Sequence, residues 1–542
     1  MNGNMMFQPL LISNLIEHAE MYHGDTAVIS KNTDGSMTHS NWAQVAKNSK
    51  RFANVLQSFG LSLSDRVATV AWNNHRHLEA WYAISGSGLI CHTINLRLFP
   101  EQLIYIINDA HDRVVLFDKN FVHLIVSIKE YLPNVEHFIC LDAYDSAIVD
   151  AFPEVKFYDQ LLDTQSDQYV WPELEESLAS SLCYTSGTTG HPKGVLYSHR
   201  STVLHSYAIS MPDSLNFSAM DVVMPVVPMF HVNAWGAPYT AAMVGCSLVL
   251  PGPMLDGISL VNLIDQYHVT NALGVPTIWQ GLLTAAHQLG SQLHSLKRNV
   301  VGGATCPPSM IKTFRDVYQC ETIHAWGMTE TSPIGSVNQL KAKHAELSEA
   351  EQFKLRFSQG RPPFGVTLRI SDDEKSQQEL PRDGQTTGHL QIKGHWIVDT
   401  YFGKNSNALT EDGWFDTGDI ATLDADGYLS IRDRSKDLIK SGGEWISSVE
   451  LENIAIAHPE IENVAVIAAT HLKWDERPIL IAKKSAMSQI TETDLLNYYT
   501  DKIAKWQIPD KVIFVDTIPM GGTGKVLKKD LREQFGAILL ES

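Results

Sequence analysis

The 542-residue sequence predicts an α/β protein with two unequal domains. The larger, N-terminal domain is expected to hold two βαβ-type sheet subdomains and a small β-rich subdomain, and the smaller C-terminal domain is expected to be α+β. Three observations predict this division. The chain is longer than one hydrophobic core usually holds. Apolar strand-like runs alternate with helical patterns at 65–118 and again at 220–300, and short strands with turns follow residue 363.

The first sheet subdomain is preceded by the clearest helix of the sequence, at 38–60. Ser40 is placed to cap this helix and Gly60 to end it. One face at i, i+3, i+4 spacing is formed by Trp42, Val45, Ala46, Ser49, Phe52, Ala53 and Leu56. The apolar runs that follow are continuous, as in buried parallel strands. They predict strands at 65–72, 88–95 and 113–118, with helices at 75–84 and 100–110.

The remaining units follow in order along the chain. The second sheet subdomain is predicted from strands at 221–230 and 246–252 and a helix at 261–267, and the β-rich subdomain from strands at 365–371, 388–394 and 427–433. In the C-terminal unit, Ser447 and Glu450 form a capping-box pattern, and strands are expected at 463–469 and 478–484 with a helix at 491–504. The charged segment 431–445 marks the boundary, which gives domains at 1–433 and 434–542.

Composition narrows the class of protein. An apolar fraction of 44% and a charged fraction of 19% are typical of a soluble globular chain. The net charge of −19 argues against nucleic acid as a partner, because phosphate backbones are bound by basic surfaces. Neither a membrane span nor a signal peptide is expected. The six cysteines have neither CxxC nor zinc spacing, so we expect a reducing, cytoplasmic environment.

The stretch YTSGTTGHPKGV, residues 184–195, has the composition of a loop that holds phosphate. Glycines allow the backbone to approach a ligand closely, successive N–H groups form an anion-binding concavity, and Lys193 adds a positive charge. The apolar runs on either side predict that the loop joins two strands. A surface hairpin turn is the alternative. A Walker A loop is disfavoured, because Pro192 precedes Lys193 and Gly194 follows it.

Five further stretches place a glycine turn beside an acid, an aromatic residue or a lysine: PMFHVNAWG (228–236), VGGATCPP (301–308), HAWGMTETSP (324–333), GWFDTGDIA (413–421) and MGGTGKVLKKDLR (520–532). Each stretch alone has a structural interpretation. A lone loop histidine is more often structural than catalytic, the DTGD aspartates are typical turn-formers, Glu330 fits a helix cap, and a lysine on a glycine turn is usually solvated.

In combination and in this order, the six stretches resemble the adenylate-forming superfamily, which comprises acyl-CoA synthetases, firefly-type luciferases and the adenylation domains of peptide synthetases. The resemblance covers essentially the whole chain, and TSGTTGHPKG is its strongest motif. Four segments are most similar to medium- and long-chain fatty acyl-CoA synthetases, and equally to ligases that activate 3-methylmercaptopropionate. These segments are PMFHVNAWG, HAWGMTE, DRSKDLIKSGGEWISSVELE and HLKWDERP.

The resemblance implies two half-reactions that use ATP, Mg²⁺ and CoA. A carboxylate attacks the α-phosphate of ATP, giving acyl-AMP and pyrophosphate, and the CoA thiol then displaces AMP. This chemistry needs positive charge and oriented N–H donors. The resemblance assigns the α-phosphate to Thr329 and magnesium, which needs few carboxylates, to Glu330. It assigns the β- and γ-phosphates to Thr185, Ser186, Gly187, Thr188, Thr189 and Lys193.

For the nucleoside, the resemblance implies that Asp419, assisted by Arg434, binds both ribose hydroxyls. Adenine is expected to lie between the turn Gly303-Ala304-Thr305 and the segment His324-Ala325-Trp326-Gly327-Met328. The commoner family pattern has a polar amide or acid and then tyrosine before this glycine, whereas this chain has His324 and Trp326. Because an indole supplies no hydroxyl, His324 is the candidate that reads the adenine amino group.

The resemblance also implies a mobile C-terminal domain. Lys525 matches the lysine that bridges carboxylate and α-phosphate during adenylation, and Lys436 matches the hinge. Rotation about the hinge is expected to withdraw Lys525 and to bring in a CoA channel formed by Ser441, Gly442, Gly443, Glu444 and Trp445. The acyl group is expected to lie beside His231, Trp235, Gly302, Gly303 and Pro333, and the large Trp235 favours short or medium acids.

The leading hypothesis is therefore an AMP-forming acid–CoA ligase for short- or medium- to long-chain acids, with 3-methylmercaptopropionate as an alternative substrate. An enzyme that loads a carrier protein is a second class, although we recognise no appended carrier with a phosphopantetheine serine in this sequence. A luciferase-like monooxygenase is a third. A non-enzymatic scaffold would be expected to lose Lys525, Glu330 or Asp419, and all three are present. A homodimer is expected from family analogy alone.

Overall fold

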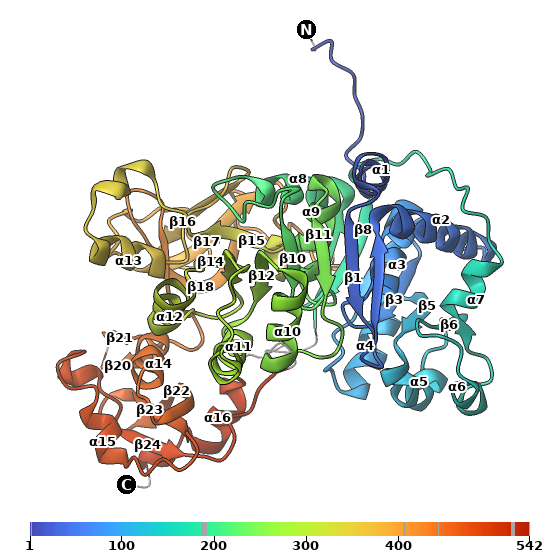
Figure 1. The fold of residues 1–542 in the computed structure, drawn as a ribbon. Helices are drawn as coiled ribbons and strands as arrows, with labels where there is room; N and C mark the ends of the chain where they lie inside the picture. The colour runs from blue at the N-terminus through green and yellow to red at the C-terminus, as the bar shows by residue number, and fades with distance from the viewer. Residues whose placement is uncertain (2, 186–191, 405–407, 443, 522–525, 541–542) are drawn as a thin grey trace.

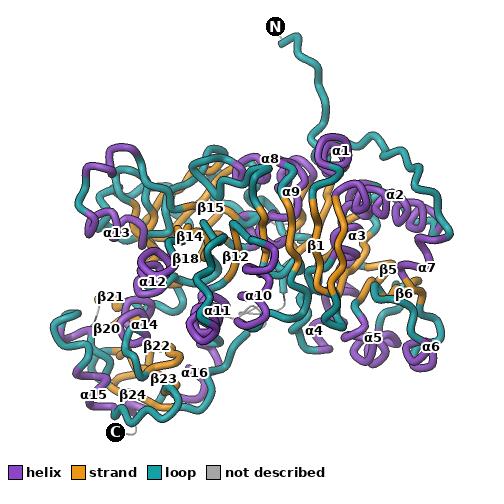
Figure 2. The backbone as a smooth tube through the Cα atoms, viewed as in Figure 1, coloured by secondary structure: helices purple, strands orange, loops and turns teal. Residues whose placement is uncertain are grey.

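The computed structural model describes residues 1, 3–185, 192–404, 408–442, 444–521 and 526–540. Within these residues the strands form four sheets. Figure 1 shows the two larger sheets, the β-rich subdomain and the C-terminal unit as neighbouring parts of the molecule. Helices cover the two larger sheets and part of the C-terminal sheet (Figure 2). The predicted α/β class, with a large N-terminal part and a smaller C-terminal part, is confirmed.

A seven-stranded sheet forms the first subdomain, in the order β7-β6-β5-β3-β4-β8-β9. Neighbouring strands are parallel except β8 and β9, which are the antiparallel strands that flank the predicted phosphate loop. The strands are β3 Arg66–Val70, β4 Ile90–Thr93, β5 Asp112–Phe117, β6 His137–Cys140, β7 Lys156–Phe157, β8 Ala179–Tyr184 and β9 Gly194–Ser198. The helices between them are α3 His75–Gly86, α4 Pro100–Ala110, α5 Val122–Ile128, α6 Ser146–Ala151 and α7 Tyr158–Asp163.

An eight-stranded, mostly parallel sheet forms the second subdomain, in the order β15-β14-β13-β12-β10-β11-β1-β2. Its strands are β1 Ala27–Lys31, β2 Met37–Asn41, β10 Val222–Pro225, β11 Ser247–Leu250, β12 Asn271–Gly274, β13 Arg298–Val301, β14 Glu321–Gly327 and β15 Ile334–Val337. Its helices are α1 Ile12–His23, α8 His199–Ser210, α9 Ala237–Val244, α10 Gly257–Tyr267, α11 Pro276–Leu289, α12 Pro308–Tyr318 and α13 Glu349–Phe357. Helix α2, Trp42–Ser58, follows β2 in the chain and packs mainly against α3 of the first subdomain. None of the described helices is both long and apolar enough to cross a lipid bilayer.

One apolar core joins the two larger sheets. It draws buried side chains from strands of both sheets and from α2, α3 and α9, and the rings of Trp81 and Tyr239 stack within it with centroids 5.5 Å apart. The predicted N-cap of α2 is wrong by one residue. Residues 37–41 pair with β1, so the chain stays extended through Ser40, and the side chain of Asn41 accepts the capping hydrogen bond from the Gln44 N–H.

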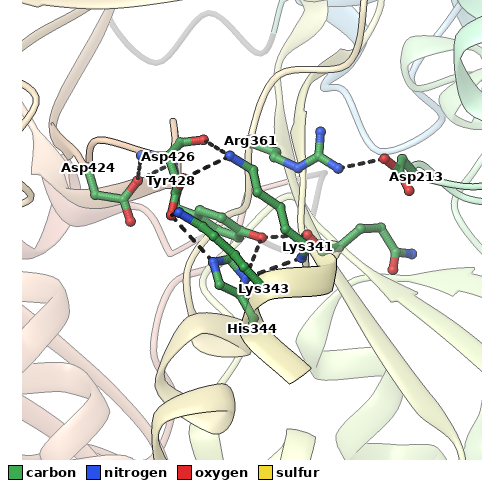
Figure 3. Close-up of polar contacts among 9 residues, drawn as sticks. Asp213, Lys341, Lys343, His344, Arg361, Asp424, Asp426 and Tyr428 are labelled. Carbon is green, nitrogen blue, oxygen red and sulfur yellow. Dashed lines mark hydrogen bonds and ion pairs between the residues drawn. The ribbon is translucent and has the colours of Figure 1, made fainter. Parts of the chain in front are cut away.

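The β-rich subdomain is a four-stranded antiparallel sheet of β16 Val366–Ser371, β17 Gly388–Gly394, β18 Phe415–Leu423 and β19 Leu429–Arg434. The turn between β18 and β19 is fastened to the segment that follows β15 (Figure 3). The carboxylate of Asp426 accepts hydrogen bonds from the ammonium groups of Lys343 at 2.6 Å and Lys341 at 3.0 Å, which hold its pKa well below the usual range. The Tyr428 hydroxyl donates to the Gln339 carbonyl at 2.7 Å. These contacts fix the hairpin that carries Asp419 and Arg434.

The C-terminal unit lies beneath the larger part in Figure 1 and is built on a five-stranded sheet. Its strands are β20 Ile439–Ser441, β21 Glu444–Ile446, β22 Ile461–His471, β23 Asp475–Lys484 and β24 Lys511–Phe514, and its helices are α14 Ser448–Ile456, α15 Glu492–Asn497 and α16 Lys528–Phe535. The side chain of Ser447 caps α14 by accepting from the Glu450 N–H. The domain boundary expected at 433–434 falls at the last residues of β19.

Candidate active site

A cavity of about 740 Å³ lies where the loops of the large part meet the start and the end of the C-terminal unit. Its volume is in the range of small-molecule sites. It collects many of the predicted site residues from distant parts of the sequence: Thr185, Lys193, His231, Trp235, Gly302, Gly303, Ala325, Trp326, Gly327, Met328, Thr329, Glu330, Pro333, Arg434 and Lys436.

The lining of this cavity contains both apolar and polar side chains. The apolar part is formed by Leu215, Val232, Trp235, Val300, Ala325 and Ile334. The polar part includes Thr185, Lys193, Thr329, Glu330, Tyr401 and Arg434, together with Glu374 and Asp416. Burial raises the pKa of Asp416 to about 6. Such a cavity offers a charged, hydrogen-bonding region to one part of a ligand and an apolar region to another.

The phosphate-loop prediction falls mainly outside the described residues, which include neither Ser186, Gly187, Thr188 nor Thr189. The two ends of the loop are described. The Thr185 N–H donates to the Lys193 carbonyl at 2.9 Å, and the Lys193 N–H donates to the Thr185 hydroxyl at 3.1 Å. These reciprocal bonds close the base of the loop between β8 and β9 and hold both residues at the polar part of the cavity.

Glu330 lies in a short 3-10 helix, Thr329–Thr331, and its side chain faces the cavity although the residue is only 8% exposed. Its Oε1 atom accepts a hydrogen bond from the Tyr401 hydroxyl at 2.9 Å. Among the described residues, no cluster of three His, Cys, Asp or Glu side chains is arranged to hold a metal. A single buried carboxylate near Thr185 and Lys193 fits Mg²⁺, which takes its other ligands from phosphate oxygens and water.

Asp419 is held from two sides. Its Oδ1 atom pairs with the Arg434 Nε at 2.7 Å across the β18–β19 ladder, and its Oδ2 atom accepts from the Trp326 indole N–H at 2.8 Å. Gly335 makes room for the indole, because a Cβ there would lie 2.2 Å from Trp326 Cζ3. The indole therefore orients the carboxylate. Sequence reasoning missed this role, and the partners are too far apart along the chain for a motif to reveal it.

His324, the candidate for reading adenine, does not line the cavity. It is buried away from the cavity lining, the Cys306 N–H donates to its Nε2 at 3.3 Å, and its Nδ1 lies 3.1 Å from the Phe357 carbonyl. Burial lowers the pKa of His324 to about 4, so the ring is neutral and donates through Nδ1. Both ring nitrogens therefore have backbone partners, and neither is free for the adenine amino group in this structure. Ala304 and Thr305 are also absent from the lining, whereas Gly303 is part of it.

The apolar end of the cavity is shaped by an unusual turn. From Val232 to Gly236 every residue has a positive φ, between 47° and 75°, which is costly for L-residues. The buried Asn233 anchors the turn to β8 by donating to the Ser181 hydroxyl at 2.9 Å. The turn directs Trp235 against Gly302, where a Cβ would lie 3.0 Å from the indole Cη2. The cavity therefore has a tryptophan in its wall.

The C-terminal residues divide into two groups. Val526 lines the cavity, and the preceding Lys525 lies outside the described residues. The predicted CoA-channel residues Gly442, Glu444 and Trp445 do not line it, and Trp445 is 53% exposed on the β20–β21 hairpin. Gly443 lies outside the described residues. In this arrangement Val526, at the start of the described residues 526–540, faces the cavity, and the β20–β21 hairpin does not.

Comparison with known proteins identifies the family to which this chain belongs. The model of the AMP-binding enzyme family matches residues 15–402, and the model of the AMP-binding enzyme C-terminal domain matches residues 450–525. The chain belongs to the AMP-binding enzyme family. The predicted membership of the adenylate-forming superfamily is thereby confirmed.

Relatives of this AMP-binding enzyme extend over its full length. It is 58% identical to a 3-methylmercaptopropionyl-CoA ligase of Ruegeria lacuscaerulensis, over 99% of each chain. It is 56% identical to a medium-chain-fatty-acid–CoA ligase of Ectopseudomonas oleovorans, over 100% of this chain and 99% of that one. The predicted reaction class, an AMP-forming acid–CoA ligase, is confirmed at this level. A crystal structure of an anthranilate CoA ligase with anthranoyl-AMP shares the fold, with a TM-score of 0.86, 23% identity and coverage of 97% and 98%.

Proposed function

We propose that this AMP-binding enzyme converts a short- or medium-chain carboxylic acid to its CoA thioester through an acyl-adenylate. The observation that carries the proposal is the two-part cavity, in which Glu330 and Lys193 lie in the polar region and Trp235 lies in the apolar wall. The carboxylate oxygen attacks the α-phosphorus and the bond to pyrophosphate breaks. The CoA thiolate then attacks the acyl carbon, and AMP leaves.

Individual residues take the following roles in this proposal. Glu330 holds Mg²⁺, which offsets phosphate charge, and Lys193 and Thr185 bind the outer phosphates with Ser186, Gly187, Thr188 and Thr189. Thr329 contacts the α-phosphate. Asp419 and Arg434 bind the ribose, and Gly303 and Trp326 lie beside the adenine. His231 lies near the substrate carboxylate, with Trp235, Gly302 and Pro333 around the acyl group.

We also propose that residues 434–542 move as a unit about Lys436. The support is the division of the C-terminal residues described above: Val526 lines the cavity while Gly442, Glu444 and Trp445 lie off it. One orientation cannot place both groups at the same reacting carbonyl. Rotation would exchange Lys525 for the β20–β21 hairpin between the two half-reactions, which is a known type of domain movement.

A second candidate substrate is 3-methylmercaptopropionate. Two ligases named for its CoA ester, from Ruegeria lacuscaerulensis and Ruegeria pomeroyi, are 58% and 57% identical to this chain. Its short unbranched chain also suits a cavity with Trp235 in its wall. Loading of a carrier protein has no comparable support, since the relatives from Ruegeria lacuscaerulensis and Ectopseudomonas oleovorans are named CoA ligases.

The substrate proposal is tested by AMP release with octanoate, palmitate and 3-methylmercaptopropionate. We expect the wild-type kcat/KM for the best shorter acid to exceed that for palmitate by about tenfold or more, since each methylene in a closed pocket changes discrimination by about tenfold or more. Trp235→Ala should raise the palmitate-to-octanoate ratio by about tenfold. A loss of folded enzyme lowers both rates equally and so does not change this ratio. Trp506→Ala is the control, because Trp506 is half-exposed and does not line the cavity, and it should leave the ratio unchanged. Palmitate as the best wild-type substrate contradicts the proposal.

We propose a homodimer as the quaternary state, because symmetric dimers are the commonest soluble oligomers. The exposed apolar side chains of Met5, Met6 and Phe7 are candidates for a contact between copies. Light scattering after size exclusion should give about twice the chain mass of 60.3 kDa. A mass of one chain at micromolar concentration contradicts this prediction.

We place the enzyme in the cytoplasm on the basis of its cysteines. All six are buried and unpaired, as is usual for proteins of a reducing compartment. Its proposed partners are small molecules: the acid, ATP and CoA.

A further inference from the structure

Tyr401 lies between two segments that carry predicted site residues. The Val398 N–H donates to the Glu330 carbonyl at 2.9 Å, and the Phe402 N–H donates to the Gly194 carbonyl at 2.8 Å. Residues 398–402 therefore bridge the 3-10 helix of Glu330 and the start of β9, next to Lys193. Tyr401 itself lines the cavity. Its side chain contacts both Glu330 and Lys193.

The hydroxyl and the ring of Tyr401 make two chemically different contacts. The Tyr401 hydroxyl donates to Glu330 Oε1 at 2.9 Å. The Lys193 ammonium lies over the same ring, 4.7 Å from its centroid, at the distance of a cation–π contact. One side chain thus contacts the carboxylate assigned to magnesium and the ammonium group assigned to phosphate.

Two opposite charges in one partly buried cavity attract each other strongly. Among the ion pairs between described residues, none joins Glu330 to Lys193. If the two side chains did pair, the ammonium group would occupy carboxylate oxygens that a metal needs, and would turn away from the phosphates. A phenol ring between them gives each charge a weaker partner that a ligand can replace or share.

We propose that Tyr401 is a positioning residue that keeps Glu330 and Lys193 apart and oriented before the nucleotide binds. The hydroxyl acts on Glu330 and the ring acts on Lys193. This inference rests on the proposed function, because it takes the roles of Glu330 and Lys193 from it.

Two variants separate the hydroxyl from the ring. Tyr401→Phe keeps the ring over Lys193 and removes the donor to Glu330, whereas Tyr401→Leu removes both. Binding is measured by calorimetry with α,β-methylene-ATP, a non-hydrolysable analogue, with and without Mg²⁺. We expect Tyr401→Phe to raise the Kd of the magnesium complex by about tenfold, as loss of a hydrogen bond to a charged group does, and to leave the metal-free Kd unchanged. Tyr401→Leu should weaken both.

The controls distinguish failure of this inference from failure of the proposed function. Tyr207→Phe, at a half-exposed position on α8, should match the wild type. Glu330→Gln should itself remove the gain from Mg²⁺, and adding Tyr401→Phe to it should cause no further loss. If Glu330→Gln leaves the gain intact, the proposed metal role fails. If Glu330→Gln removes the gain from Mg²⁺, the positioning role of Tyr401 can still fail in two ways. It is overturned if Tyr401→Phe binds the magnesium complex like the wild type. It is also overturned if Tyr401→Phe weakens metal-free binding by the same factor.

Discussion

Replacing Lys525 with alanine is expected to slow adenylate formation by about 10²–10³-fold, the usual cost of removing one preorganised group that stabilises charge in the transition state. The attack on the α-phosphorus concentrates negative charge on a five-coordinate phosphate, and an ammonium group beside it lowers the barrier. Lys525 lies outside the described residues, but Val526, the next residue, lines the cavity together with Arg434 and Lys436. Thioester formation from supplied acyl-adenylate should be spared.

The two half-reactions are measured separately for this variant. Pyrophosphate release reports adenylation, and consumption of synthetic acyl-adenylate with CoA reports thioester formation. Lys529→Ala is the matched control, because this lysine lies nearby on α16 and its side chain is 67% exposed. Equal losses in both half-reactions would show that Lys525 serves folding or general binding and not adenylation.

Replacing Asp419 with asparagine is expected to lower kcat/KM for ATP by about a hundredfold. In the proposed role, two hydrogen bonds from ribose hydroxyls would exchange a charged acceptor for a neutral one, which costs about 1–1.5 kcal/mol each. Asparagine keeps the shape of the side chain, so the bond from the Trp326 indole can persist. The substitution also leaves Arg434 without its counter-charge at 2.7 Å. The loss should appear mainly in the KM for ATP, with the KM for the acid little changed.

Steady-state kinetics with ATP varied at saturating acid checks this expectation. A second measurement compares ATP with 2′-deoxy-ATP, which lacks one ribose hydroxyl. The substitution should lower kcat/KM less for 2′-deoxy-ATP than for ATP. Asp150→Asn, at an exposed position in the first subdomain, is the control. If ATP and 2′-deoxy-ATP lose the same factor, Asp419 does not bind the 2′-hydroxyl, and the proposed contact with both ribose hydroxyls is wrong.

Several elements follow from the sequence because their cause is local. The helix at 100–110 is predicted within its exact bounds, since its proline start and its apolar spacing lie inside the helix itself. The antiparallel pair β8–β9 follows from apolar runs on either side of a glycine-rich loop. The N-cap of α2 was misplaced, because pairing of residues 37–41 with β1 is a tertiary contact that helix-start signals do not contain.

The candidate site shows the same division. Its charged residues stand out in motifs, because a loop that binds phosphate needs glycine, hydroxyl and lysine within a few residues. The side chains that hydrogen-bond to these charged residues do not stand out in motifs. Tyr401 bonds Glu330 across 71 residues, and Trp326 bonds Asp419 across 93. His324 lies inside a motif, yet its ring is taken up by Cys306 and Phe357. No short-range pattern distinguishes a motif residue that faces the cavity from one that faces the core.

By itself, the sequence determined the family, the reaction class and the α/β architecture, because motif chemistry and the periodicity of apolar residues depend on neighbours a few positions apart. Only the tertiary structure decided which side chains orient the charged groups and how Trp235 enters the cavity wall. It also showed which end of the C-terminal unit faces the cavity. These features depend on contacts between segments brought together by packing of a shared core, and the free energy of such contacts has no signature in local sequence.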